Sequence, residues 1–430
     1  MTGATISRVT AWEALDSRGR PTVGCVVSLA NGAHGRALAP SGASTGSHEA
    51  RELRDGDERY DGFGVRRAVA NVEAVLRDAV MGLDARDTAA VDAALERMDA
   101  DPLLGGVGAN AVLAISLAAA LAGADAARMP LWRLLGGNRP RLPMPMVNII
   151  SGGAHAGRAL DVQDILAVPV GATTFTQALE WVSRVRAGTA EVLRERGHAT
   201  ALVADEGGLA AALPDNEAAL AAVVDGIHRA GLAPGADVSL AVDIAANQLW
   251  DGEAYHLELE GERLDERAWL RRLLSWCDAY PVVSLEDVLA EDEWHGWAAA
   301  TSLLGTDCQI VGDDLFATNA ARLERGFQTS VANAVLVKPN QAGTFSRARR
   351  VLELAQRQGY ATVVSARSGD TEDHWLSDLA VGLDAGQIKV GSTMRSERTT
   401  KWNRLLEIEA SAGGAACLAP WPWADDHPLR

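Results

Sequence analysis

The sequence predicts an α/β protein in which a small α+β domain precedes a (β/α)-type barrel, and two observations predict this fold. Alternating apolar segments open the chain, whereas after residue 139 short continuous apolar runs each end in a polar residue and lead into a helical stretch. Continuous apolar strands that alternate with helices are typical of a parallel sheet. At least six such units favour a closed barrel over a doubly wound sheet. The GxGxxG motif that is typical of many doubly wound sheets follows none of the predicted strands.

The first domain is expected over residues 1–138. Three apolar segments separated by turn residues predict a meander of antiparallel strands, at 9–15, 21–30 and 34–40. Helices are expected at about 65–100 and 109–127. The second helix is rich in alanine and interrupted by polar residues and glycine, which indicates a buried helix and not a membrane span.

The barrel is expected over residues 139–410, after the proline-rich stretch at 139–145. Its apolar runs end in polar residues 22 to 43 positions apart, at Asp243, Glu286, Asp313, Lys338, Arg367 and Lys389. Each interval suits a strand, a helix and two loops. In a (β/α) barrel, residues at these strand ends line the active site. Residues 411–430 are rich in Gly, Ala, Pro and Trp and are predicted to form a tail.

The composition excludes several classes of function. The formal charge of −17 argues against a protein that binds nucleic acid through a basic face. A small anionic substrate stays compatible, because a metal or a few local cations reverse the field in a pocket. Four scattered cysteines form no CxxC and no Cys/His cluster, which argues against structural zinc. Without a signal-like apolar start, a cytoplasmic protein is expected.

Three carboxylates close three consecutive predicted strands: Asp243, Glu286 and Asp313. Three acids at one rim repel each other unless a cation lies between them, and oxygen ligands suit Mg²⁺ or Mn²⁺. For one acid alone, capping of the following helix is the better interpretation. Three acids in register favour a metal site.

Only three of the 40 basic residues are lysines, at 338, 389 and 401. Unlike Arg, Lys can lose its proton when its surroundings favour the neutral form. Beside a metal, Lys338 is therefore a candidate base for the proton α to a carboxylate whose enediolate the metal stabilises. Lys389 suits a fixed cation. The alternative for Lys338 and Lys389 is a surface lysine without a function. For Lys401, a lysine kept by chance is as good an interpretation as a functional one.

Further polar residues stand in loops that suit substrate binding. Arg367 and Ser368 are suited to a phosphate, the alternative being a structural pair of Arg367 with Asp370 or Asp373. The SGASTG loop at 41–46 is a candidate lid that brings a hydroxyl to metal. Glu206 is a candidate acid opposite Lys338. Three more polar contacts are expected, at His155, Gln163 and Asp164.

These motifs together resemble the enolase family from about residue 6 to 409. The resemblance is carried by ALDSRGRPTV, PSGASTG, HEARELRDGD, GANAVLAISLA, NIISGGAHAG, VADEGG, SLED, VGDDLFATN, VKPNQAG, VSARSGDTED and GSTMRSER. It implies a small α+β domain on a modified (β/α)8 barrel, usually in a homodimer. It also implies Mg²⁺-dependent interconversion of 2-phosphoglycerate and phosphoenolpyruvate. The pairing of a lysine base with Mg²⁺ is a known feature of this superfamily.

Position by position, the resemblance implies two Mg²⁺ ions. Asp243, Glu286 and Asp313 match the ligands of the tight ion, and Ser44 matches the lid residue at the second, substrate-linked ion. Lys338 matches the base, and the acid is matched by Glu206. The remaining matches are substrate contacts: His155, Gln163, Arg367, Ser368 and Lys389.

The departures from the family pattern lie mainly on the phosphate and leaving-group side. Ala366 stands where enolases have His, and Asp164 where they have Glu. We therefore expect a specialised paralogue for a phosphorylated or phosphonate substrate, similar to the enolase-like enzymes of phosphonate-antibiotic pathways. The alternatives are an ordinary phosphopyruvate hydratase and a non-catalytic binding protein. A homodimer or larger homo-oligomer that binds neither nucleic acid nor membrane is expected.

Overall fold

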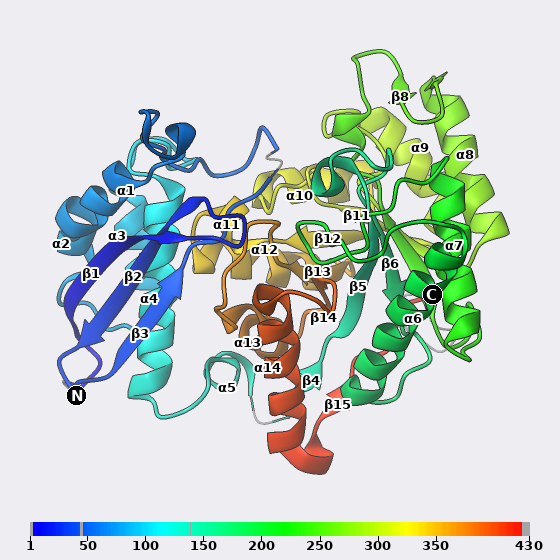
Figure 1. Ribbon diagram of the computed structural model, residues 1–430. Coiled ribbons are helices and arrows are strands. Elements are labelled where there is room, and N and C mark those ends of the chain that lie inside the picture. The colour runs from blue at the N-terminus through cyan, green and yellow to red at the C-terminus, as the bar shows by residue number, and fades with distance from the viewer. Residues whose placement is uncertain (1–2, 44–45, 138, 424–430) are drawn as a thin grey trace.

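The computed structural model describes residues 3–43, 46–137 and 139–423, and Figure 1 shows their arrangement. The N-terminal part contains a three-stranded sheet in the order β1-β2-β3, formed by Ile6–Leu15, Pro21–Leu29 and His34–Leu38. Both strand pairs are antiparallel, with Ala11 opposite Cys25 and Cys25 opposite Ala37. The predicted meander is therefore present.

Helices cover one face of this sheet. They are α1 (Arg66–Asn71), α2 (Arg77–Val80), α3 (Thr88–Glu96), α4 (Ala109–Ala126) and α5 (Leu131–Gly136), with η1 (Arg59–Gly62) before them and η2 (Val72–Leu76) between α1 and α2. Helix α4 packs on β2 and β3. A Cβ at Gly35 would lie 2.2 Å from the Ala118 carbonyl oxygen, so glycine permits this close approach. By length and composition α4 could cross a membrane, but 83% of its apolar window is buried inside the protein, as the sequence predicts.

The second part is a closed barrel of eight strands in the order β10-β11-β12-β13-β14-β5-β6-β7. In chain order these are β5 (Met144–Ser151), β6 (Asp164–Val168), β7 (Ser239–Asp243), β10 (Val282–Glu286), β11 (Gln309–Gly312), β12 (Ala334–Val337), β13 (Ala361–Ser365) and β14 (Gly386–Gly391). The helices of this part are α6 (Phe175–Glu195), α7 (Asn216–Arg229), α8 (Glu266–Ala279), α9 (Trp294–Leu304), α10 (Ala320–Thr329), α11 (Pro339–Ala342), α12 (Phe345–Arg357), α13 (Trp375–Gly382) and α14 (Ser396–Ala412). The longest predicted interval, between Asp243 and Glu286, also holds a hairpin of β8 (Tyr255–Leu257) and β9 (Glu262–Leu264).

Strand β6 departs from the expected all-parallel barrel because it runs antiparallel to both neighbours, β5 and β7. The connection from β5 to β6 contains only the short turn η3 (Gly153–Ala156) and no crossover helix. A parallel neighbour would need such a crossover. Helices α6 and α7, which pack against each other, then join β6 to β7. As a consequence the first residue of β6, Asp164, lies at the rim where the other strands end.

The described part of the segment after residue 410, as far as residue 423, packs against the barrel. Helix α14 continues through the expected boundary to Ala412. Beyond it, β15 (Cys417–Leu418) pairs in parallel with β4 (Arg141–Leu142). Trp421 is 3% exposed and packs with the apolar side chains inside the barrel, among them Met144, Met146, Leu166, Leu336 and Val363. The expected domain end at residue 138 lies outside the described residues.

Candidate active site

Polar residues from neighbouring strands form a ring at one rim of the barrel. Ser151 of β5 pairs with Asp164 of β6, Asp164 with Asp243 of β7, and Asp243 with Glu286 of β10. All four are buried. Asp243 and Glu286 are the last residues of their strands, whereas Asp164 is the first residue of the reversed strand. The register therefore brings three acidic side chains side by side.

Lys389 joins two carboxylates of this ring. It lies in β14, and its Nζ donates to Asp243 Oδ2 at 2.6 Å and to both Glu286 carboxylate oxygens at 2.8 Å. Gln163 Nε2 donates to the same Asp243 oxygen at 3.1 Å. A buried charge is stable only when it is paired in this manner. Lys389, predicted from the polar residues at strand ends, thus contacts two of the three predicted metal ligands.

The third predicted ligand, Asp313, follows β11 and has different partners. Lys338, which follows β12, donates its Nζ to Asp313 Oδ2, and Gln341 Nε2 donates to Asp313 Oδ1 at 2.9 Å. Carboxylate oxygens of Asp287, Asp313 and Asp314 lie within 4.8 Å of one another. Among the described residues, the compact acidic group that contains Asp313 is therefore formed with the adjacent Asp314 and with Asp287, which follows Glu286. Asp243 and Glu286 share Lys389, whereas Asp313 is paired with Lys338.

The electrostatics of this rim reflect an excess of negative charge. Burial raises the pKa of Glu286 well above its ordinary value, and the charge of Asp243 adds to the effect. Burial favours the neutral form of Asp313, but the ammonium of Lys338 outweighs it and holds the Asp313 pKa below its ordinary value. Burial likewise opposes the charged form of Lys338, yet the charge of Asp313 raises the Lys338 pKa. In the metal-free protein Lys338 is therefore an ammonium, not the uncharged amine that a base requires.

A second cluster lies across the barrel mouth from Lys338. His155, in η3, places Nδ1 2.8 Å from Asp164 Oδ2 and Nε2 3.8 Å from Glu206 Oε1. Asn148 Nδ2 donates to the other oxygen of Asp164. Burial opposes the imidazolium, but the charges of Asp164 and Glu206 raise the pKa of His155 to about 9. In the barrel order β12 and β6 are four places apart in eight, so Lys338 and this cluster face each other.

Arg367 and Ser368 follow β13 and connect the barrel to the N-terminal part. Arg367 Nη1 donates to Glu49 Oε2 at 2.7 Å, and both side chains are buried. The amide of Ala43 donates to Ser368 Oγ at 2.6 Å. The alternative pairs of Arg367 with Asp370 or Asp373 are not the ones formed here.

The acids of those alternatives have other partners. Asp370 binds Lys401 Nζ at 2.8 Å, and Asp373 lies 3.3 Å from Arg36 Nη1. Lys401 also donates to the carbonyls of Thr371 and Glu397, so its role is to hold a loop on α14. Each of the three lysines is paired with an acid. Lys389 and Lys401 are buried, whereas the side chain of Lys338 is 13% exposed.

Ser44, the predicted ligand of a second metal ion, lies outside the described residues. Two residues of the site were missed at the level of sequence, Glu49 and Gln341. Both stand inside motifs that carry the family resemblance, HEARELRDGD and VKPNQAG. Glu49 also accepts from the Gly46 amide at 3.0 Å. No spacing rule connects residue 49 to residue 367, so only the folded chain shows this pair.

The comparison with family models agrees with this architecture. The model of the enolase N-terminal domain matches residues 6–135, and the model of the enolase C-terminal TIM barrel domain matches residues 140–421. The chain belongs to the enolase family. The two matches together cover nearly the whole of this chain, and they meet between α5 and β4.

The rim of this enolase-family protein has a donor set that fits a divalent cation. Asp243, Glu286 and Asp313 all offer oxygen ligands, and the group at this rim whose ligand atoms lie within 4.8 Å of one another is Asp287, Asp313 and Asp314. Lys389 Nζ already marks a position where Asp243 and Glu286 bind one positive charge together. Three carboxylates against two ammonium groups leave a negative excess that a cation would neutralise.

Proposed function

We propose that this enolase-family protein is a Mg²⁺-dependent enzyme that removes the α-proton of a 2-phosphoglycerate-type carboxylate and forms an enolpyruvate product. One observation carries the proposal: the amines of Lys338 and Lys389 converge on Asp313, Asp243 and Glu286 at one end of the barrel. A binding protein without catalysis has no need for two lysines paired with a buried acidic ring, of which Lys389 is buried and Lys338 is 13% exposed. Such a ring costs free energy of desolvation that only mutual pairing offsets.

Each residue is assigned a role that its position supports. Lys338 takes the proton from C2, and Lys389 holds the substrate carboxylate and its developing charge. Glu206, which faces Lys338 from the opposite side, delivers a proton to the leaving group. Arg367, Ser368, His155 and Gln163 are suited to hold the anionic end and the orientation of the substrate.

Magnesium would be held by Asp243, Glu286 and Asp313, where it supplies Lewis-acid stabilisation of a carboxylate dianion. Lys338 can accept a proton only when it is uncharged. In this chain that requires the charge of Asp313 to be taken up by another cation, because Asp313 stabilises the ammonium. Dependence of catalysis on metal thus follows from the contact between Asp313 and Lys338.

The finer proposal concerns the substrate. Ala366 directly follows β13, precedes Arg367 and is 6% exposed. Because this residue is Ala, the site lacks the imidazole that enolases have at this position. Asp164, one methylene shorter than the usual Glu, is fully engaged by His155 and Asn148. Both changes lie on the side assigned to the phosphate and the leaving group. They favour a specialised reaction resembling that of carboxyphosphonoenolpyruvate synthase, with a phosphonate or bulkier group at that end.

Isotope exchange at C2 tests the proposal. Wild-type protein with Mg²⁺ and 2-phosphoglycerate in deuterated water is expected to exchange the C2 proton, and NMR measures the loss of its signal. Exchange without phosphoenolpyruvate supports the specialised reaction. Exchange with rapid dehydration identifies an ordinary phosphopyruvate hydratase. If neither 2-phosphoglycerate nor a phosphonate analogue exchanges, a binding role replaces the proposal.

Two variants separate the base from the metal site. Lys338→Ala is expected to abolish exchange while calorimetry still detects Mg²⁺ binding. The matched control is Lys401→Ala, because Lys401 is also a buried lysine paired with an Asp but contacts none of the rim carboxylates. Retained exchange in Lys338→Ala would refute the assignment of the base.

A further inference from the structure

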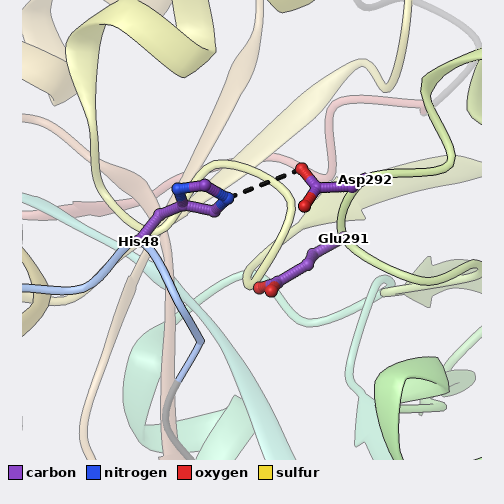
Figure 2. Close-up of side chains that lie close together, drawn as sticks. All are labelled: His48, Glu291 and Asp292. Carbon is purple, nitrogen blue, oxygen red and sulfur yellow. Dashed lines mark ion pairs between the residues drawn. The ribbon is translucent and has the colours of Figure 1, made fainter.

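A third group of possible ligands lies outside the ring described above. His48 belongs to the N-terminal part, directly before Glu49, whereas Glu291 and Asp292 stand in the loop between β10 and α9. Figure 2 shows the three side chains facing one another across these two parts of the chain. One ligand atom of each residue lies within 4.8 Å of the other two, and His48 Nε2 is 3.5 Å from Asp292 Oδ1.

Each carboxylate of this group uses one oxygen and leaves the other available. Ser47 Oγ donates to Glu291 Oε1 at 2.6 Å. Arg322 donates through Nη1 and Nη2 to Asp292 Oδ1, both at 3.1 Å. The guanidinium therefore holds the same Asp292 oxygen, Oδ1, that lies nearest His48 Nε2. A ligand would bind Asp292 through its second oxygen, Oδ2.

Two atoms of the group are buried polar atoms without a hydrogen-bond partner. They are His48 Nε2 and Glu291 Oε2. Buried polar atoms in native proteins normally have a partner, and a bound ion is one explanation for two neighbouring atoms that lack one. The His48 side chain as a whole is 37% exposed, and its Nε2 is within ion-pair range of Asp292. The same point is kept open by a glycine, because a Cβ at Gly46 would lie 3.1 Å from Glu291 Oε2.

We propose that His48, Glu291 and Asp292 form a second, separate cation site that binds a Zn²⁺-type transition-metal ion in preference to Mg²⁺. Imidazole nitrogen and carboxylate oxygen are both ligands of Zn²⁺, and three protein ligands leave its fourth position open. Imidazole suits Zn²⁺, Co²⁺ and Ni²⁺, whereas Mg²⁺ prefers oxygen ligands only. The nitrogen ligand therefore distinguishes this site from the all-oxygen rim.

The surroundings allow entry of a hydrated ion. The imidazole of His48 is 37% exposed, so solvent reaches one side of the group. The side chain of Asp292 is 62% exposed, so water can complete the coordination shell. Because the ligands come from both parts of the chain, a bound ion would fasten residue 48 to the β10–α9 loop.

Cobalt binding in the presence of saturating Mg²⁺ tests the site without relying on activity. Wild-type protein is expected to bind one Co²⁺ with visible d–d absorption that Zn²⁺ removes and Mg²⁺ does not, and Zn²⁺ is expected to raise the Tm. His48→Gln and Glu291→Gln are each expected to weaken Co²⁺ binding at least about tenfold. Near-UV circular dichroism establishes whether each variant is folded. If His48→Gln does not fold, Glu291→Gln tests the site.

The matched control is His34→Gln, because His34 is a surface histidine whose Nδ1 lies 3.9 Å from a single carboxylate, that of Asp125. It is expected to leave Co²⁺ binding unchanged. The proposal is overturned if Co²⁺ affinity is the same in wild type and both site variants. It is also overturned if Mg²⁺ displaces the bound Co²⁺, because the ion would then be bound at the rim. Equal weakening of Co²⁺ binding by His34→Gln would overturn it as well.

Discussion

The buried pair of His155 and Asp164 makes the stability of the metal-free protein depend on pH in a defined direction. His155 is 8% exposed, its Nδ1 lies 2.8 Å from Asp164 Oδ2, and its pKa is raised from 6.5 to about 9. Since each pKa unit corresponds to 1.36 kcal/mol, this difference corresponds to about 3 kcal/mol of preference for the charged imidazole in the folded state.

The sign follows from the raised pKa. The folded protein binds the proton of His155 more tightly than the unfolded chain does, so the contribution is fully present below pH 6.5. It is lost as the pH rises through about 9. Asp164→Asn removes the closest negative charge, and burial then disfavours the imidazolium. We therefore expect Asp164→Asn to lower the pKa of His155 and to destabilise the protein by a few kcal/mol near pH 6, with a smaller difference above pH 9.

Two measurements check this prediction. Histidine-selective NMR titration in the presence of EDTA gives the pKa of His155, assigned with a His155→Gln variant. Denaturant unfolding of wild type and Asp164→Asn at several pH values gives the difference in free energy of unfolding. The control is Asp251→Asn, which removes the exposed partner of His256, 2.6 Å away, and is expected to leave the His155 titration unchanged. A wild-type His155 that titrates near 6.5 would refute the reasoning.

Three further predictions concern packing, the contact between the two parts of the chain, and specificity. Trp421→Ala is expected to lower the free energy of unfolding by about 3–5 kcal/mol in denaturant titrations, because it empties a buried position inside the barrel. Glu49→Gln is expected to cost about 3–5 kcal/mol in the same assay, because it removes the carboxylate that pairs with buried Arg367; an unchanged midpoint would contradict this. Ala366→His is expected to raise the rate of phosphoenolpyruvate formation from 2-phosphoglycerate, measured by ultraviolet absorbance, and no gain would show that the other departures dominate.

The sequence predicted the barrel because its signal is local. Each apolar run ends at a polar residue, and this pattern located the ends of β7, β10, β11 and β12 within one residue. The convergence of Lys389 with Asp243 and Glu286 follows from the same rule. Their roles as metal ligands and substrate contact stay predictions, as does the role of Lys338.

Three features could not be predicted in this way. The reversal of β6 depends on the missing crossover helix after β5, which the apolar pattern of a short strand does not reveal. The pairs of Glu49 with Arg367 and of His155 with Asp164 depend on which loops meet at the rim. The segment around Trp421 looked like a tail because its composition lacks strand and helix periodicity. Its burial comes from fitting the interior of the barrel.

The closure of the barrel, in which its first and last strands pair, has a consequence for synthesis of the chain. Strand β5, the first barrel strand to be made, pairs with β14, the last, and β15 returns to pair with β4 beside it. During translation the early edge must therefore wait unpaired while the intervening helices and strands emerge. An exposed edge strand invites pairing with other chains. Until β14 is made, Met144–Ser151 therefore lacks its partner on that side, and shielding of this edge would favour folding over association.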